Sequence, residues 1–196
     1  MKFSKLPFLI IALAVVAFVP VRSAMAADKE PTALQLFKDG NEYIGKEARD
    51  RLVQIRSEKS VATLTPNIWY IVYYDPDATA KAVEVKFGAG KKLTVKRPGR
   101  FLEFATGNTE MDRSKVKVDS DKALATAIKE PILNKLTLTS SQMWLEQNRD
   151  YGVVWKVRLW AAKLRNAEKS VDLGEVYIAA DDGRVVKTDL HINRVD

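Results

Sequence analysis

The 196-residue chain contains no cysteine and only one histidine. Without cysteine there is no disulfide, no thiolate metal site and no lipid-attachment thiol, so packing alone must hold the core. With His191 as the lone histidine, no Ser-His-Asp triad can draw on another histidine base, and no two-histidine zinc site can form. The sequence therefore indicates no metal and no cofactor.

Other catalytic signatures are equally scarce. The stretch 88–94 has the look of a phosphate-binding loop, but Val85 and Lys92 stand where that motif needs glycine and Ser/Thr. It predicts a hairpin turn instead. An Asp-Gly turn accounts for Asp181 and Asp182, whereas calcium requires six or more oxygens from a dedicated loop. The chain is therefore predicted not to be an enzyme; the alternative is a secreted hydrolase whose site residues are too scattered to see.

Long apolar runs are limited to one, residues 6–19, close to the start of the chain. Lys2 and Lys5 precede it, and Ala24-Met25-Ala26 supplies the small residues that signal peptidase requires. This pattern predicts a signal peptide over residues 1–26, cleavage between Ala26 and Ala27, and a periplasmic or secreted protein. A membrane-anchoring helix is the alternative, but the run is shorter than the ~20 residues that a span needs. No later segment approaches that length, so no membrane span is expected after cleavage.

Charge is modest once the predicted leader is removed. The whole chain carries +7, and cleavage would leave 29 basic against 25 acidic residues. The remaining charges are interspersed, which favours solubility and weak attraction to anionic surfaces over nucleic-acid binding. Export would also remove most nucleic-acid partners.

The first part of the mature chain predicts one helix and three strands. Apolar residues recur at helical spacing between 32 and 55, with a break near Asp39–Asn41. The positions that define this helix are Phe37, Ile44, Ala48, Leu52 and Ile55. Strands are expected over 68–74, 81–87 and 93–95, because these runs are rich in β-branched and aromatic residues and end in Pro, Gly or Asp clusters.

A similar order follows in the second part. Asp119 or Ser120 is a good N-cap for a helix whose apolar stripe ends at Pro131. A bent strand over 136–145, and strands over 153–161, 176–180 and 185–190, are expected after it. Asp182-Gly183 predicts a type I′ hairpin between the last two.

The repeated order predicts an α+β fold in which a helix packs on an antiparallel β-meander. It also predicts that this unit is duplicated, so that the mature chain has three segments. They are a first unit over 27–100, a linker over 101–118 and a second unit over 119–196, with Trp69 matching Trp155.

The helix 120–128, the strand 154–159 and a strand ending in Asp-Gly before a basic return strand resemble the PepSY family. Residues 119–190 carry the better match and residues 32–97 a fainter one. The resemblance implies a helix packed on an antiparallel sheet, in envelope proteins that bind or restrain a partner such as a peptidase. Family members often end the last hairpin with an acidic residue, a small residue and Gly, whereas this chain runs from Asp189 to Asn193 without that pattern.

Strand 153–161 offers the candidate binding face. Alternation places Trp155 with the core, together with Ile178 of the next strand, and puts Lys156, Arg158 and Trp160 on the opposite face, with Tyr177 nearby. Cross-strand pairing of the two cations with acids such as Glu175 is one interpretation, and a stacking platform for single-stranded nucleic acid is another. A tryptophan on the wet side predicts either a covering layer from the first unit or a bound partner.

Two function classes remain, and they differ in whether the chain has a substrate. The first is an exported, non-catalytic binding or regulatory module of the cell envelope, with an envelope protein or peptide as its partner. The second is the secreted hydrolase. The oligomeric state stays open.

Overall fold

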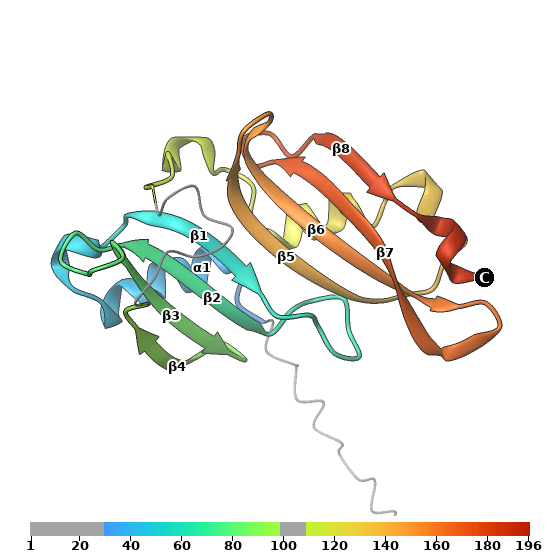
Figure 1. Cartoon of the computed structure of the whole chain (residues 1–196), viewed down its shortest axis with the longest axis horizontal. Helices are drawn as coiled ribbons and strands as arrows, with labels where there is room; N and C mark the ends of the chain where they lie inside the picture. The colour runs from blue at the N-terminus through green and yellow to red at the C-terminus, as the bar shows by residue number, and fades with distance from the viewer. Residues whose placement is uncertain (1–29, 99–108) are drawn as a thin grey trace, which may run out of the picture.

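The computed structural model describes residues 30–98 and 109–196, which form one antiparallel sheet in the order β4-β3-β2-β1-β5-β6-β7-β8 (Figure 1). The strands are β1 Leu52–Ser57, β2 Ile68–Tyr74, β3 Ala82–Gly88, β4 Lys91–Lys96, β5 Leu138–Asn148, β6 Gly152–Lys163, β7 Asn166–Ala179 and β8 Val185–Leu190. The predicted α+β class with an antiparallel sheet is confirmed. The predicted leader 1–26, its cleavage site, and residues 99–108 lie outside the described residues.

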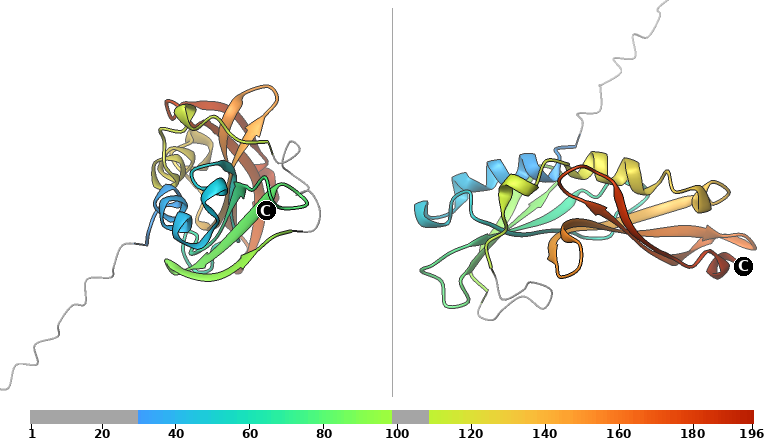
Figure 2. Two further views of the ribbon diagram at one scale, coloured as in Figure 1. Left: turned by 90° about the vertical axis from the view of Figure 1, so that its left-hand side faces the viewer. Right: turned by 90° about the horizontal axis from the view of Figure 1, so that it is seen from above.

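Both α-helices lie on the same face of this sheet, as the view from above in Figure 2 shows. They are α1 Ala33–Gly40 and α2 Ser120–Ala127, and five single-turn helices accompany them: η1 Asn41–Tyr43, η2 Lys46–Ala48, η3 Arg113–Lys115, η4 Pro131–Leu133 and η5 Ile192–Val195. We call the face opposite α1 and α2 the open face. Within the described ranges, no helix is both long and apolar enough to cross a membrane.

Each α-helix begins where the sequence provides a cap. Thr32 accepts a hydrogen bond from the Gln35 backbone N–H, and Asp119 caps α2 as predicted. Leu36 and Phe37 of α1 are buried against the sheet. The helices thus cover one face because their apolar stripes match its apolar residues.

The predicted helix over 32–55 is wrong beyond Gly40. Leu52 and Ile55 belong to β1, a central strand that pairs with β2 on one side and β5 on the other. Asp50 just before β1 has a positive φ of 59°, which no α-helix contains. Two ladders and burial of both residues outweigh the helical spacing of the apolar positions.

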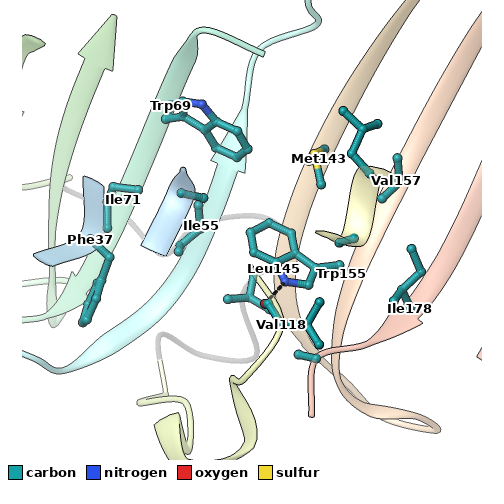
Figure 3. Packing of buried hydrophobic residues seen from close by; sticks show 14 of the residues in the cluster. Phe37, Ile55, Trp69, Ile71, Val118, Met143, Leu145, Trp155, Val157 and Ile178 are labelled. Atoms are coloured by element: carbon teal, nitrogen blue, oxygen red, sulfur yellow. Dashed lines mark hydrogen bonds between the residues drawn. The ribbon is translucent and has the colours of Figure 1, made fainter. Parts of the chain in front are cut away.

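One hydrophobic core lies between the helices and the sheet (Figure 3). Trp155 and Ile178 face each other on β6 and β7, and both are fully buried, which confirms their predicted place. The Trp155 indole N–H also donates to the Val118 carbonyl at 2.8 Å. This bond satisfies the one polar group that the ring carries into the core.

The two predicted hairpins exist, with one difference in turn type. Ala89 and Gly90 both have positive φ, as the tight β3–β4 turn requires. In the turn between β7 and β8, residues 180–184, only Gly183 does, so the predicted type I′ turn is wrong. Asp182 instead accepts a hydrogen bond from the Arg184 backbone N–H through its side chain at 3.0 Å, which gives the chain another way to reverse.

The rest of the second part also differs from its predicted outline. The bent strand predicted over 136–145 is the strand Leu138–Asn148, which has an irregularity between Leu138 and Ser140 and begins and ends a few residues later. The residues between 161 and 174, for which the sequence predicts no strand, extend β6 and β7 into a long hairpin. The sequence shows no apolar alternation in these strand extensions, because the end of the hairpin is exposed on both faces and its side chains are mostly polar.

Residues 109–118, the described part of the predicted linker 101–118, contact both β1 and the residue that follows β7. The Met111 side chain is buried, and its backbone N–H donates to the Leu52 carbonyl at 2.6 Å. Val118 is also buried, and its N–H donates to the Ala180 carbonyl at 2.9 Å. Met111 and Val118 therefore belong to the same core as the sheet.

The two halves of the chain, 30–98 and 109–196, share the order of their α-helix and strands. Each runs from one α-helix to a four-stranded antiparallel meander. They meet at what we call the seam, where Ile55 pairs with Leu145 and Arg56 with Trp144. The two halves consequently share one sheet.

Candidate functional site

The open face brings together the four residues that the sequence singled out. Lys156, Arg158 and Trp160 alternate with buried residues along β6 and are themselves partly exposed. Tyr177 lies directly opposite Lys156 on β7, so its side chain points to the same face.

A single line of paired residues crosses this face from β3 to β8. Each member is the direct register partner of the next, so all side chains emerge on one side. Cations and aromatic rings alternate along it. We call it the cross-strand row, and its members in sheet order are Lys86, Tyr70, Arg56, Trp144, Lys156, Tyr177 and Lys187. At one strand spacing per step, the row is about 29 Å long.

Neighbours in the row contact each other as cation and ring. The Arg56 guanidinium lies 3.9 Å from the Tyr70 ring centroid, and the Lys156 ammonium lies 4.8 Å from that of Trp144. Lys187 lies 5.1 Å from the Tyr177 centroid. These distances are within the range of favourable cation–π contacts. These contacts join neighbouring members of the row within each half, Tyr70 with Arg56, Trp144 with Lys156, and Tyr177 with Lys187.

Carboxylates on both sides of the row pair with three of its four cations. Arg56 pairs with Glu84 at 2.6 Å, and Lys86 pairs with Glu58 at 2.9 Å. Lys156 pairs with Glu146 at 3.3 Å, not with Glu175. Charge-assisted pairs of this kind hold the side chains of Arg56, Lys86 and Lys156 in place and offset their charges.

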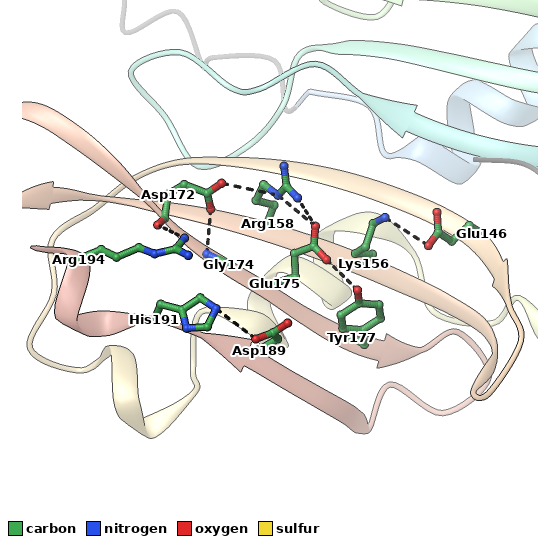
Figure 4. A network of polar contacts seen from close by, with 10 residues as sticks. All are labelled: Glu146, Lys156, Arg158, Asp172, Gly174, Glu175, Tyr177, Asp189, His191 and Arg194. Atoms are coloured by element: carbon green, nitrogen blue, oxygen red, sulfur yellow. Dashed lines mark hydrogen bonds and ion pairs between the residues drawn. The ribbon is translucent and has the colours of Figure 1, made fainter. Parts of the chain in front are cut away.

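Arg158 lies beside the row and joins it to the acids of β7 (Figure 4). Its guanidinium donates to Glu175 at 2.6 and 3.0 Å, which confirms the cross-strand pair predicted for it. Asp172 is 3.9 Å from the same group, and the Trp144 ring centroid lies at 5.7 Å. The Tyr177 hydroxyl donates to the other Glu175 oxygen at 2.7 Å. Glu175 therefore connects Arg158 to the row.

Tyr177 and Glu58 are among the groups of this face with shifted pKa values. Burial, followed by its hydrogen bond to Glu175, raises the pKa of Tyr177, so its phenol stays protonated and can donate. Hydrogen bonds from the Tyr70 hydroxyl and from Lys86 lower the pKa of Glu58. Both shifts strengthen the protonation states that the contacts require.

Trp160 lies outside the row although it shares the face. Its register partners are Ser140 on β5 and Asp172 on β7. The Lys59 ammonium, from the connection between β1 and β2, lies 4.4 Å from the Trp160 ring centroid. One residue of the first half therefore covers the ring.

The sequence interpretation missed the members of the row on other strands. Trp144 could have been found, because Gln142, Trp144 and Glu146 alternate with buried Met143 and Leu145. Arg56 was missed because the stretch that leads to it was wrongly predicted as a helix and not as a strand. That Tyr70, Arg56 and Trp144 lie in one line follows from strand register across the seam, which periodicity does not reveal.

The groups on this surface are of the kinds found at protein interfaces. It offers ring faces, guanidinium and ammonium donors and carboxylate acceptors, already ordered, over several strands. Among the described residues no cluster of three or more His, Asp or Glu side chains is placed to hold a metal ion. No protein-family model, curated protein or solved structure matches this chain significantly.

Proposed function

We propose that this protein is an exported, non-catalytic binding module of the cell envelope, and that its open face holds a protein partner. The observation that carries the proposal is the cross-strand row. Tyr, Trp and Arg are the residues that dominate binding energy at protein interfaces, and here they gather on one face that α1 and α2 leave uncovered.

The charges of this face favour a protein over a nucleic acid. Arg56, Lys86 and Lys156 each have a carboxylate within ion-pair distance. A phosphate backbone would have to displace those acids, and the acids would repel it. A protein surface with its own mixture of donors, acceptors and apolar groups meets no such cost.

The shape of the face favours a protein over a small molecule. Small ligands occupy concave sites of roughly 300–1,000 Å³. The cavity described beside the row measures about 200 Å³ and is bordered by Arg158, Arg194 and His191 with neighbouring acids. A partner that rests on the whole row, rather than one enclosed by a pocket, fits this surface best.

The charged start of the chain, the apolar run and the small residues before Ala27 support the proposed export of the protein. Duplication of one PepSY-like unit is supported by the shared order of one α-helix and four strands. Trp69 and Trp155 support it too, because each lies on the second strand of its half, is buried, and donates its indole N–H to a backbone carbonyl. The PepSY resemblance agrees with a restraining or binding role.

A matched pair of charge reversals tests the proposal. Lys187→Glu changes the exposed end of the row, whereas Lys122→Glu makes the same charge change on α2, on the other face. Each purified variant is used to capture proteins from the native envelope, and the captured partner is then measured in a binary assay. A partner retained by Lys122→Glu and weakened by Lys187→Glu supports the proposal. Equal binding by both variants, or turnover of the captured molecule, contradicts it.

A further inference from the structure

The face of the sheet that carries α1 and α2 contains a cavity near the N-terminal ends of the two helices. Figure 2 shows these helices following one another along that face. The cavity volume is about 440 Å³, within the range of small-molecule sites, whereas an apolar cavity of about 150 Å³ already holds benzene. The sheet separates the cavity from the cross-strand row, so an inference about it does not depend on the proposed function.

The walls of this cavity are mostly apolar and come from both halves. Trp69 of β2 and Met143 of β5 are buried residues that line it from the sheet side (Figure 3). Leu124 and Ile128 of α2 line it from the helix layer, and Leu64 belongs to the connection between β1 and β2. An aromatic ring, a polarisable sulfur and branched aliphatic groups therefore surround one chamber.

Several polar groups of the walls already have partners within the protein. The Trp69 indole N–H donates to the Pro66 carbonyl at 3.1 Å, and the Leu64 carbonyl accepts a serine hydroxyl at 2.6 Å. At the helix ends, the Ser120 hydroxyl accepts the Ala33 N–H at 3.0 Å. Because these groups are paired, the interior favours apolar atoms over ordered water, which needs about three polar contacts.

The charges at the mouth of the cavity give no reason for a charged ligand. Among the described residues that line it, Glu30 and Asp121 are the charged ones, and both are exposed. Asp121 also accepts the Lys122 backbone N–H at 2.8 Å. Water screens both carboxylates, so a charged group inside the cavity would lose its hydration without gaining a buried counter-charge. The walls therefore favour a neutral molecule.

From this geometry we propose that the cavity binds an uncharged small molecule with an apolar body of about ten carbons, the size that such a volume admits. The apolar body lies against Trp69, Met143 and Leu124, and any polar end stays in water at the mouth. Selection is by apolar contact and by the cost of burying unpaired polar groups.

Four ten-carbon probes test the ligand class: decanol, decane-1,10-diol, decylamine and decanoate, each titrated calorimetrically into the purified protein at pH 7. Decanol is expected to bind about tenfold or more tightly than the diol, because one diol hydroxyl has to be buried without a partner. Neither charged probe should bind more tightly than decanol. Absence of decanol binding would overturn the proposal, and so would a tenfold preference for the diol or for either charged probe.

The methionines locate the bound probe without any substitution. The chain has four, of which Met1 and Met25 lie in the predicted leader. Met143 lines the cavity, whereas Met111 is buried outside its lining. With carbon-13 in the methionine methyl groups, decanol is expected to shift the nuclear magnetic resonance signal of Met143 and to leave that of Met111 unchanged. An unshifted Met143 signal at saturating decanol would place the probe elsewhere and refute the assignment.

A matched pair of substitutions on α2 tests the location independently. Ala125 is partly exposed and lines the cavity, so Ala125→Leu should fill part of it and weaken decanol about tenfold or more, while the helix keeps a good helix former. Thr126→Leu introduces the same side chain at the next residue, outside the cavity lining, and should leave decanol affinity unchanged. Equal affinity of the two variants for decanol would contradict the proposal. If Ala125→Leu melts at a lower temperature, the Met143 signal of the parent protein decides.

Discussion

The Ser57 hydroxyl accepts a hydrogen bond from the Met143 backbone N–H at 2.9 Å, across the seam between the two halves. Both groups are buried. Next to it, the Ser141 N–H donates to the Ser60 hydroxyl at 2.8 Å, and the Ser60 N–H donates to the Ser141 carbonyl at 2.8 Å. Serine side chains therefore continue the contact between the halves beyond the last paired residues of β1 and β5.

Ser57→Ala is expected to lower the free energy of unfolding by about 1–3 kcal/mol, because it leaves the Met143 N–H buried without its acceptor. Urea unfolding measures the change. Ser170→Ala, at an exposed position of β7, is the control and should lie within about 0.5 kcal/mol of the parent. Equal stability of the two variants would show that the hydroxyl contributes nothing to the seam.

Trp155→Ala is expected to cost about 3–5 kcal/mol, because the ring is fully buried and its removal leaves a cavity and an unpaired Val118 carbonyl. Thermal unfolding followed by circular dichroism measures the loss. An unchanged melting temperature would mean that the faces of β6 are assigned the wrong way round.

Trp160→Ala is expected to cost less, about 1 kcal/mol, because the ring is only partly buried and loses mainly its contact with Lys59. Since Trp160 lies outside the cross-strand row, partner capture should stay unchanged in the folded variant. Loss of capture with unaltered melting would move the binding surface from the row toward Trp160.

The charge reversal Lys187→Glu is expected to weaken the captured partner about tenfold, which corresponds to about 1.4 kcal/mol. It places a carboxylate beside Tyr177 and Glu175 and removes the cation over the Tyr177 ring. Binding measured at two salt concentrations adds a second check. A steep decline with salt, as phosphate contacts produce, would argue for a nucleic acid in place of a protein.

Stability should fall at acidic pH partly through Glu58. Its pKa is lowered in the folded state, chiefly by the Tyr70 hydroxyl and then by Lys86, so its contribution is present above the unfolded pKa of about 4.3 and is lost as pH falls through the folded value. Glu58→Gln should therefore be less stable than the parent at pH 7, with the difference shrinking below about pH 4. Urea midpoints at both pH values measure this. Glu42→Gln controls for net charge, and a difference independent of pH would contradict the mechanism.

Much of the fold could be predicted because its signals are local. The alternation in β6, the cap at Asp119 and the glycine at position 183 each determine a structure within a few neighbouring residues. The helix prediction was wrong beyond Gly40 because the structure there depends on residues distant in sequence. Leu52 and Ile55 have helical spacing by chance, and their strand state depends on β2 and β5, which are distant in sequence.

Only the part of the candidate site that lies on β6 and its hairpin neighbour β7 could be predicted. Lys156 and Arg158 were placed on the correct face, and Tyr177 near them, because adjacent strands of a hairpin have nearly fixed register. Arg56 and Trp144 come from different halves, and their pairing depends on how the halves meet. The alternation of cations and rings over the whole sheet is consequently a tertiary property.

The seam also has a consequence for a half on its own. β1 and β5 run antiparallel, and each begins a four-stranded meander whose edge is paired by the other half. An isolated half would expose that edge, and two copies could satisfy it by an isologous contact about a two-fold axis. Residues 109–196 expressed alone are therefore expected to form a homodimer through β5, with the missing half replaced by a second copy.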